Sequence, residues 1–100
     1  MKFILSILVL ILLFGCIGMT SVKDIKDNPD KYLGEQVSVK GTVKDSFKLG
    51  KLSGFKLQDG NYSIMVSSEE LPKDGDEVVV TGTVMKEVLV GYYILAKDIS

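Results

Sequence analysis

Two stretches of the chain place an apolar residue at every second position, and they nearly repeat each other. Residues 34–43 read Gly-Glu-Gln-Val-Ser-Val-Lys-Gly-Thr-Val, and residues 75–84 read Gly-Asp-Glu-Val-Val-Val-Thr-Gly-Thr-Val. A period of two residues is the pattern of a strand with one buried face. Gly41 and Gly82 replace one valine in each series, and a glycine inside a strand is typical of a bend or of close approach by another backbone. The pattern predicts two strands, each bent at mid-length, in a small closed barrel.

Three further segments have strand character and are separated by turn-forming residues. Residues 54–59 and 62–67 alternate apolar and polar side chains on either side of an Asp-Gly pair, which favours a tight hairpin. Residues 92–99 form a more continuous apolar run, which is typical of a strand covered on both faces. We therefore expect strands over 36–44, 54–59, 62–67, 77–85 and 92–99. The connections are expected to be a loop over 45–53, one helical turn over 68–71 and a second loop or a strand-end bulge over 87–91.

The only helical pattern among these segments lies before the first strand. Ser21 is a suitable N-cap, while Pro29 ends a first helical turn and can begin a second. We expect two short turns lying across one end of the barrel. Four side chains of this segment are expected to face the core: Val22, Ile25, Tyr32 and Leu33.

The order of these elements resembles that of the OB-fold, a five-stranded Greek-key barrel. The resemblance rests on Val-Ser-Val-Lys-Gly-Thr-Val in the first strand, Gly-Phe-Lys-Leu-Gln-Asp-Gly at the hairpin, Gly-Asp-Glu-Val-Val-Val-Thr-Gly-Thr-Val in the fourth strand and the closing Tyr-Tyr-Ile-Leu-Ala. This resemblance covers Gly34 to Ile99, and the members of the family that the chain resembles are the small exported OB-like modules. It implies an all-β barrel, with a short N-terminal helical segment, in which the first and fourth strands are neighbours. The family's longer helix between strands three and four has no room here, so residues 21–33 are expected to cap the barrel instead.

The first 19 residues differ from the rest of the chain. Lys2 precedes an unbroken run of apolar and small residues that ends at Gly15 and Cys16, which is the pattern of a secretory signal. Leu13-Phe14-Gly15-Cys16 resembles the lipobox of exported prokaryotic lipoproteins. That resemblance implies a lipid on Cys16 and a domain outside the cytoplasm. An uncleaved membrane anchor is the other interpretation, because the apolar run continues to Met19 and approaches the roughly 20 residues that span a bilayer.

Both interpretations divide the chain into a signal peptide or anchor over 1–19 and an OB-fold barrel domain over 20–100. Both also tether that domain to a membrane, on its extracytoplasmic face. Two lipid chains on a cysteine anchor a protein stably, since each buried CH₂ contributes roughly 0.8 kcal/mol.

Composition argues against several classes of function. The chain has 100 residues and a net charge of −1, its 12 basic residues are all lysines, it has one cysteine, and it has no histidine. This is not the basic balance of a dedicated nucleic-acid binder. The absence of histidine excludes the usual catalytic triads and most imidazole metal sites, and a lone cysteine forms no internal disulfide. We predict no enzyme, no cofactor and no metal site, and we expect the acidic clusters at 69–70 and 74–77 to be solvated turns.

The resemblance also implies a place for a ligand. OB-folds bind on the face of strands two and three, between the loops that follow strands one and four. In this chain the candidate ligand-binding residues are Phe47, Lys48 and Lys51 in the first loop and Lys56 and Gln58 on the second strand. An aromatic ring beside lysines can stack on a base and hold its phosphate. The same residues equally suit a loop in which Phe47 packs over the barrel end while the lysines keep it soluble.

Two functions stay open at this point. The first is a membrane-tethered, extracytoplasmic binding module for a protein or a small ligand at the cell envelope, without catalysis. The alternative is a single-stranded nucleic-acid-binding OB-fold protein. Nucleic acid is the less expected partner, because phosphate binding relies on neutralisation by Lys and Arg, and the chain has balanced charge and no arginine.

Overall fold

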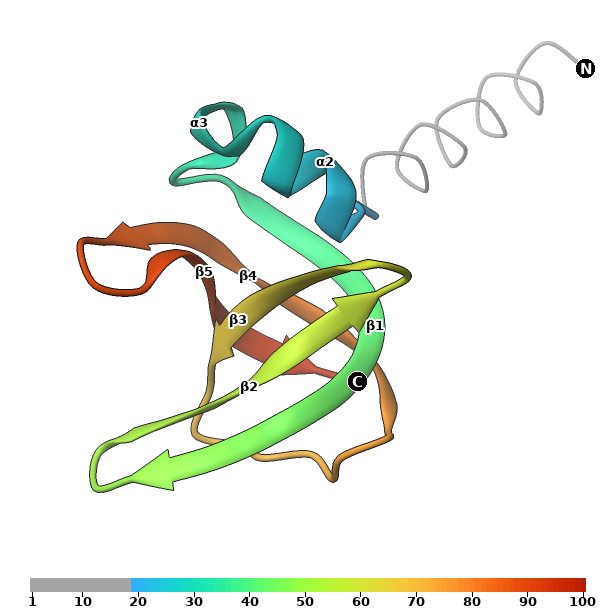
Figure 1. Ribbon diagram of the computed structural model, residues 1–100, viewed down its shortest axis with the longest axis vertical. Coiled ribbons are helices and arrows are strands. Elements are labelled where there is room, and N and C mark those ends of the chain that lie inside the picture. The colour runs from blue at the N-terminus through green and yellow to red at the C-terminus, as the bar shows by residue number, and fades with distance from the viewer. Residues whose placement is uncertain (1–18) are drawn as a thin grey trace, which may run out of the picture.

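A computed structural model describes residues 19–100 of the chain, and the predicted lipidation site, Cys16, lies outside the described residues. Five strands close into a barrel in the order β1-β2-β3-β5-β4 (Figure 1). The strands are β1 (Gln36–Leu49), β2 (Leu52–Asp59), β3 (Tyr62–Ser67), β4 (Glu77–Glu87) and β5 (Gly91–Ile99). All neighbours are antiparallel except β3 and β5, which form a short parallel pair. The predicted all-β, five-stranded OB-fold barrel is confirmed.

The two repeated stretches lie side by side, as expected for the first and fourth strands. β1 pairs with β4 so that Val39 faces Val80 at the centre of the shared segment. Both glycines are buried within this sheet. A Cβ atom added to Gly41 would lie 2.7 Å from the carbonyl oxygen of Gln58, and one added to Gly82 would lie 2.3 Å from that of Leu95. Only glycine permits backbones to approach this closely, so the two residues are required by the curvature of the barrel.

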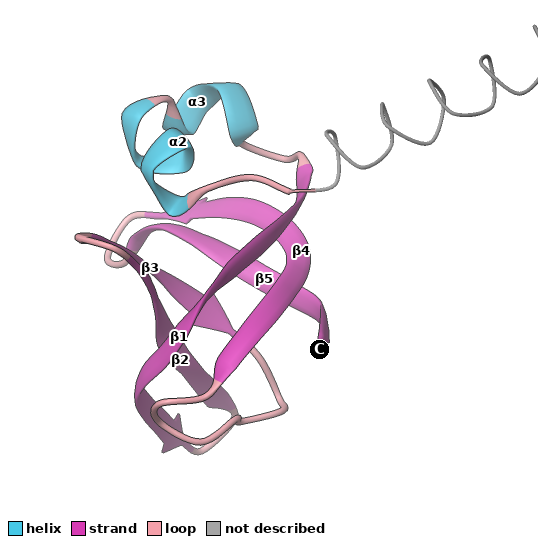
Figure 2. Cartoon of the chain, turned by 90° about the vertical axis from the view of Figure 1, so that its right-hand side faces the viewer, coloured by secondary structure: helices cyan, strands magenta, loops and turns pink. Residues whose placement is uncertain are grey.

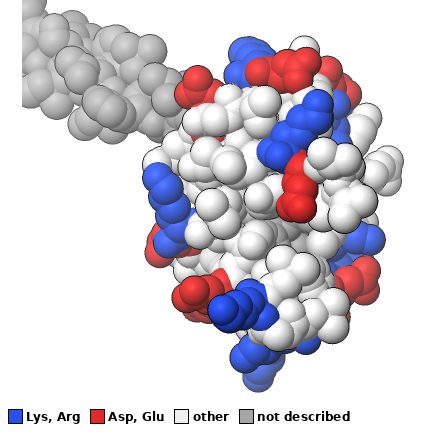
Figure 3. All heavy atoms as spheres, turned by 90° about the vertical axis from the view of Figure 1, so that its left-hand side faces the viewer, with Lys and Arg blue, Asp and Glu red and all other residues white. Residues whose placement is uncertain are grey.

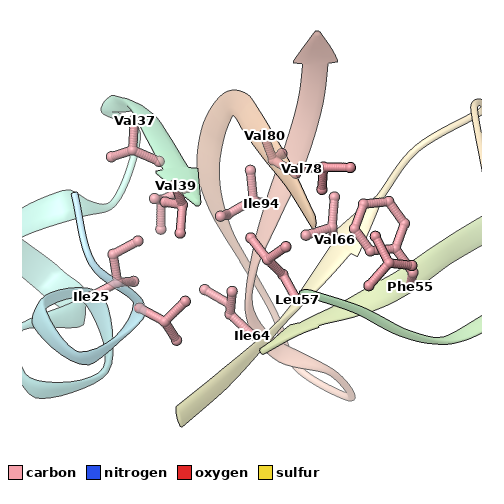
Figure 4. Close-up of a cluster of buried hydrophobic side chains, with 13 residues drawn as sticks. Ile25, Val37, Val39, Phe55, Leu57, Ile64, Val66, Val78, Val80 and Ile94 are labelled. Carbon is pink, nitrogen blue, oxygen red and sulfur yellow. The ribbon is translucent and has the colours of Figure 1, made fainter. Parts of the chain in front are cut away.

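The core is formed by alternate residues of all five strands and by the first helix. Figure 4 shows it extending from Ile25 at one end to Phe55 at the other. Thirteen apolar residues of the described part are buried, which are Val22, Ile25, Val37, Val39, Val43, Phe55, Leu57, Ile64, Val66, Val78, Val80, Val84 and Ile94. The burial predicted from the alternating valines of β1 and β4 is confirmed for Val37, Val39, Val43, Val78, Val80 and Val84. The expectation that β5 is covered on both faces is wrong, because Ile94 faces the core whereas Leu95 is 45% exposed on the outer face.

Two short helices cover one end of the barrel (Figure 2). They are α2 (Val22–Asp27) and α3 (Pro29–Tyr32). The Oγ atom of Ser21 accepts a hydrogen bond from the backbone N–H of Asp24 at 3.1 Å, which is the expected N-cap. Val22 and Ile25 are buried and Tyr32 is half-buried, but Leu33 is 44% exposed because it follows the last helical residue. Among residues 19–100, neither helix has the length and apolarity that crossing a membrane requires.

The predicted loop over 45–53 is instead an extension of the β1–β2 hairpin. β1 continues to Leu49, and the chain reverses at Gly50, which has a φ of +62°. The strand survives because a bulge between Lys44 and Phe47 absorbs the change in apolar alternation.

The predicted helical turn over 68–71 is also absent. The Oγ atom of Ser68 accepts a hydrogen bond from the N–H of Glu70, two residues on, at 3.1 Å. This contact forms a side-chain turn that competes with a helical turn.

Candidate functional site

An apolar groove lies on the side of the barrel from which the β1–β2 and β4–β5 turns project, at the left of Figure 1. It encloses about 100 Å³ and is lined chiefly by Phe47, Leu52, Met65, Val90 and Tyr93. Its residues come from the ends of β1 and β2, from the middle of β3, from the β4–β5 turn and from β5. The strands thus supply a fixed floor and the turns supply two walls.

Strand register explains why Met65 and Tyr93 form the floor. Met65 pairs with Lys56 on one side and with Tyr93 on the other. Side chains of directly paired residues share a face of the sheet. The neighbouring residues Ile64 and Ile94 point into the core, so this row of three side chains faces outward.

A β-bulge directs Phe47 into the groove. Without it, the alternation that buries Val43 would also turn Phe47 inward, whereas the extra residue pairs Phe47 with Gly54 on the outer face. The bulge is held by Ser46, whose N–H donates to Asp74 Oδ1 at 3.1 Å and whose Oγ donates to the carbonyl oxygen of Pro72 at 3.2 Å.

The ring of Phe47 lies over Gly54. Its Cζ atom is 3.4 Å from the place that a Cβ atom on this glycine would take. The same added Cβ atom would lie 2.2 Å from the carbonyl oxygen of Val66, so a larger residue does not fit here. Gly54 therefore allows the aromatic ring to lie close against the hairpin and to form one end of the groove.

The lysines predicted to accompany Phe47 do not gather around it. Lys48 pairs with Ser53 and so faces the opposite side of the hairpin from Phe47. Lys51 lies in the turn and borders a separate, more polar hollow beside β5. Lys56 is on the groove face, where its Nζ atom is 3.6 Å from Asp45 Oδ2 in a partly exposed ion pair. Such a pair adds little to stability, but it occupies the lysine that lies nearest the groove floor.

Gln58 lies away from the groove. Its Nε2 atom donates to the carbonyl oxygen of Gly60 at 3.1 Å, within the β2–β3 turn. It borders another hollow, beside the start of α2. Of the five candidate ligand-binding residues, the structure therefore brings only Phe47 into the groove, with Lys56 beside its floor, whereas Gln58 lies on the same face of β2 but at its far end.

Sequence reasoning missed most of the residues that form the groove. Met65 and Tyr93 are adjacent only through the parallel β3–β5 pair, which no local pattern reveals. The β4–β5 turn did carry a signal, since Val88-Leu89-Val90 places three apolar residues where a turn is normally polar. In the structure Val88 is 98% and Leu89 91% exposed.

The base of the β4–β5 turn is fastened to the helical end of the barrel. The hydroxyl of Tyr92 donates a hydrogen bond to Asp30 Oδ1 on α3. This bond to a carboxylate raises the pKa of Tyr92 above its ordinary value of 10.0, because it favours the protonated phenol. The Nζ atom of Lys86 lies 5.2 Å from the centre of the same ring, at the distance of a cation–π contact.

The surface around the groove is largely uncharged. Figure 3 views the side that lies at the left of Figure 1, where uncharged surface occupies the middle and charged side chains lie around it. Within residues 19–100 there is no cluster of His, Cys, Asp or Glu suited to a metal ion. What the groove itself offers a ligand is apolar and aromatic contact, bordered by the carboxylate of Glu87.

Comparison with known proteins places the fold. No family model matches the chain, and no curated protein resembles it in sequence. Among solved structures, the OBody AM3L15 bound to hen egg-white lysozyme matches with a TM-score of 0.68 and 23% identity, over 82% of this chain and 91% of that one. The OBody AM1L10 bound to the same protein matches with 0.66 and 22%, over 83% and 91%.

A domain-sized match also exists within a much larger protein. Asparaginyl-tRNA synthetase from Pyrococcus horikoshii, in complex with asparaginyl-adenylate, matches with a TM-score of 0.61 and 15% identity. The match covers 70% of this chain and only 19% of the synthetase. At these identities the likeness concerns the fold alone: residues 19–100 form an OB-fold barrel, an architecture used for binding.

Proposed function

We propose that this chain is a membrane-tethered, extracytoplasmic binding module that holds a protein or a small ligand at the cell envelope and performs no catalysis. The observation that carries the proposal is the distribution of exposed apolar side chains. Nine large apolar residues are exposed in the described part of the chain, and five of them lie on or beside the two turns that flank the groove: Leu49, Leu52, Val88, Leu89 and Val90. Clustered apolar exposure of this kind marks an interaction site.

The position of the groove supports the same function. It lies across β2 and β3 between the β1–β2 and β4–β5 turns, where OB-folds bind their ligands. Two of the similar barrels are themselves bound to a protein, hen egg-white lysozyme. A rigid floor of strands with apolar walls suits a partner that already has a defined shape.

The lipobox-like leader supplies the tether in this proposal. The described chain begins beside β1, where the N–H of Thr20 donates to the carbonyl oxygen of Ser38 at 2.8 Å. In Figure 1, α2 starts at the right of the barrel and the two turns project at the left. A tether attached before α2 therefore leaves the groove open to a partner outside the membrane.

Charge around the groove favours this function over nucleic-acid binding. Lys48 faces away from Phe47, and Lys56 is paired with Asp45. Glu87 borders the groove and would repel a phosphate backbone. These contacts turn Lys48 away from the aromatic ring and place a carboxylate beside Lys56, which weakens the case for phosphate binding at Phe47.

Crosslinking in intact cells tests the proposal. A photoreactive amino acid at Tyr93, in the groove, should yield a covalent adduct, whereas the same group at Lys40 on the opposite side should not. Cys16→Ser should release the chain from the membrane fraction, as expected for a lipid-anchored module. A chain that forms no adduct at Tyr93 would contradict the binding role. Salt-sensitive oligonucleotide binding that is lost in Phe47→Ala would favour the nucleic-acid alternative instead.

A further inference from the structure

The size of the groove indicates what kind of partner it accepts, and this step rests on the proposed function. Pockets for small molecules typically enclose about 300–1,000 Å³. The apolar groove encloses about 100 Å³, which is closer to the roughly 150 Å³ of a core cavity made by truncating a single leucine. The groove therefore suits one apolar side chain of a protein, and not an entire small ligand.

The same face of the molecule carries a side chain of this kind. Leu89 is 91% exposed at the tip of the β4–β5 turn, and Val90 of the same turn lines the groove. The position of the turn is fixed by the strands that it connects, since β4 and β5 remain paired up to Glu87 and Gly91. A projecting leucine and a cavity of matching size thus adjoin on one surface.

We propose that the partner is a second copy of this chain, related by a two-fold axis, with Leu89 of each copy in the groove of the other. A surface that carries both the projection and the cavity is complementary to itself, which is the requirement of a two-fold interface. Two-fold homodimers are also the commonest protein assemblies. The pairing buries Leu89 and Val88 on each copy and covers the floor formed by Met65 and Tyr93.

The position of the turn argues for a protein partner rather than the bilayer. α2, which follows the proposed tether, begins on the side of the barrel away from the β4–β5 turn (Figure 1). A fluid lipid surface has no need of a cavity beside the projecting leucine, whereas a protein interface packs side chains into such cavities.

A charge-exchange experiment tests the dimer with the full chain in detergent. Leu89→Asp places a carboxylate in the partner's apolar groove, and Met65→Lys places an ammonium group in the groove floor. Each variant alone should weaken self-association at least about tenfold, because both put an unpaired charge into the interface. An equimolar mixture should form heterodimers again, since one contact is native and the other pairs the introduced Asp with the introduced Lys. Sedimentation velocity measures all three states.

Matched controls separate this effect from misfolding. Leu33→Asp changes an exposed apolar residue away from the groove and should leave the dimer intact. Leu89→Asp should keep the unfolding temperature of the monomer, because its side chain is almost fully exposed. A wild-type chain that stays monomeric at about 100 μM, or a mixture that fails to associate, would overturn the proposal.

Crosslinking from position 89 distinguishes failure of the dimer from failure of the proposed function. A photoreactive group at Leu89 should form an adduct with Phe47, Met65 or Tyr93 of a second copy. An adduct with a different protein would overturn the dimer while the binding role stands. Adducts with lipid alone, or the absence of any adduct from position 89 and from position 93, would overturn both the dimer and the proposed binding function.

Discussion

Gly41 of β1 lies opposite Val78 of β4 in the register of the barrel, and Gly82 of β4 lies opposite Val37 of β1. The two nearly identical stretches run antiparallel, so each presents its glycine to the first valine of the other. A backbone carbonyl of a third strand comes within 2.7 Å of the Cβ position at Gly41 and within 2.3 Å at Gly82. The repeat therefore meets one packing requirement twice, and it does not mark two binding sites.

Replacing either glycine should destabilise the barrel without altering the groove. Gly41→Val and Gly82→Val each force a side chain against a backbone carbonyl that cannot rotate away. We expect a loss of at least about 2 kcal/mol in the free energy of unfolding, which lowers Tm by about 10 °C or more in a domain of this size. Thermal unfolding followed by circular dichroism measures the shift.

A control for these variants lies on the same strand. Thr83→Val exchanges one β-branched residue for another of similar size, next to Gly82 at a half-buried position, and should leave Tm nearly unchanged. If both glycine variants also melted at the wild-type temperature, the close approach of β2 to Gly41 and of β5 to Gly82 would be refuted.

The helical segment should contribute to stability through its two buried residues, of which Ile25 is the larger and Val22 the smaller. The Ile25 side chain is 1% exposed and fills the end of the barrel beneath α2. Ile25→Ala should cost about 2–5 kcal/mol, because it leaves a cavity in the core. Lys26→Ala, on the exposed side of the same helix, should change stability by less than about 0.5 kcal/mol. Equal effects in urea denaturation would mean that α2 does not close the barrel.

Acid should weaken the contact that holds the bulge beneath Phe47. The N–H of Ser46 donates to Asp74, and this backbone hydrogen bond, aided by the Ser46 side chain, lowers the pKa of Asp74 below its ordinary value of 3.8. A depressed carboxyl pKa stabilises the fold above the pKa of the unfolded chain, and this contribution is lost as pH falls through the folded value. Asp74→Asn keeps an acceptor oxygen but has no charge to lose.

The free energy of unfolding of the wild type should therefore exceed that of Asp74→Asn at pH 6, and the two should converge as pH falls below 3.8 and through the lowered pKa of Asp74. Glu69→Gln removes the same charge from the same exposed connection and serves as the control. A difference between wild type and Asp74→Asn that stays constant over this range would show that ionisation of Asp74 does not contribute.

The sequence predicts the core better than the groove, for a physical reason. Burial in a barrel follows the two-residue period of a strand, so Val37, Val39 and Val43 could be assigned to the interior from their spacing alone. The pairing of the two valine stretches followed from the resemblance to the OB-fold. After a bulge the two-residue period is interrupted, so the sequence spacing no longer predicts which face of the strand a residue such as Phe47 occupies.

Phe47 illustrates what local pattern cannot supply. Its outward direction depends on the bulge at Ser46, which is held by Asp74 from a connection 28 residues away in the chain. The groove floor likewise depends on Met65 meeting Tyr93 across a parallel pair. Such contacts arise only when distant segments fold together. The apolar residues of the turn at Val88 can be seen in the sequence, but a binding role for them could be inferred only once the structure showed the groove beside the turn.

The hydrogen bond between Tyr92 and Asp30 should be measurable as a shifted tyrosine titration. Because the raised pKa belongs to the folded state, the bond stabilises the fold below the ordinary tyrosine pKa, and this contribution disappears as pH rises through the folded value. The difference in ultraviolet absorbance between wild type and Tyr92→Phe isolates this phenol among the other tyrosines.

Asp30→Asn should move the Tyr92 midpoint back towards 10.0, since an amide accepts the bond without the charge that opposes the phenolate. Asp27→Asn removes an equal charge from the neighbouring helix and should leave the midpoint where it is in wild type. Because Tyr92 follows directly after the β4–β5 turn, Asp30→Asn should also speed amide hydrogen exchange at Gly91 while leaving exchange at the buried Val39 unchanged. Identical Tyr92 titration midpoints in Asp30→Asn and Asp27→Asn would mean that the overall charge of the helices, and not this hydrogen bond, sets the Tyr92 pKa. The β4–β5 turn would then be held by strand pairing alone.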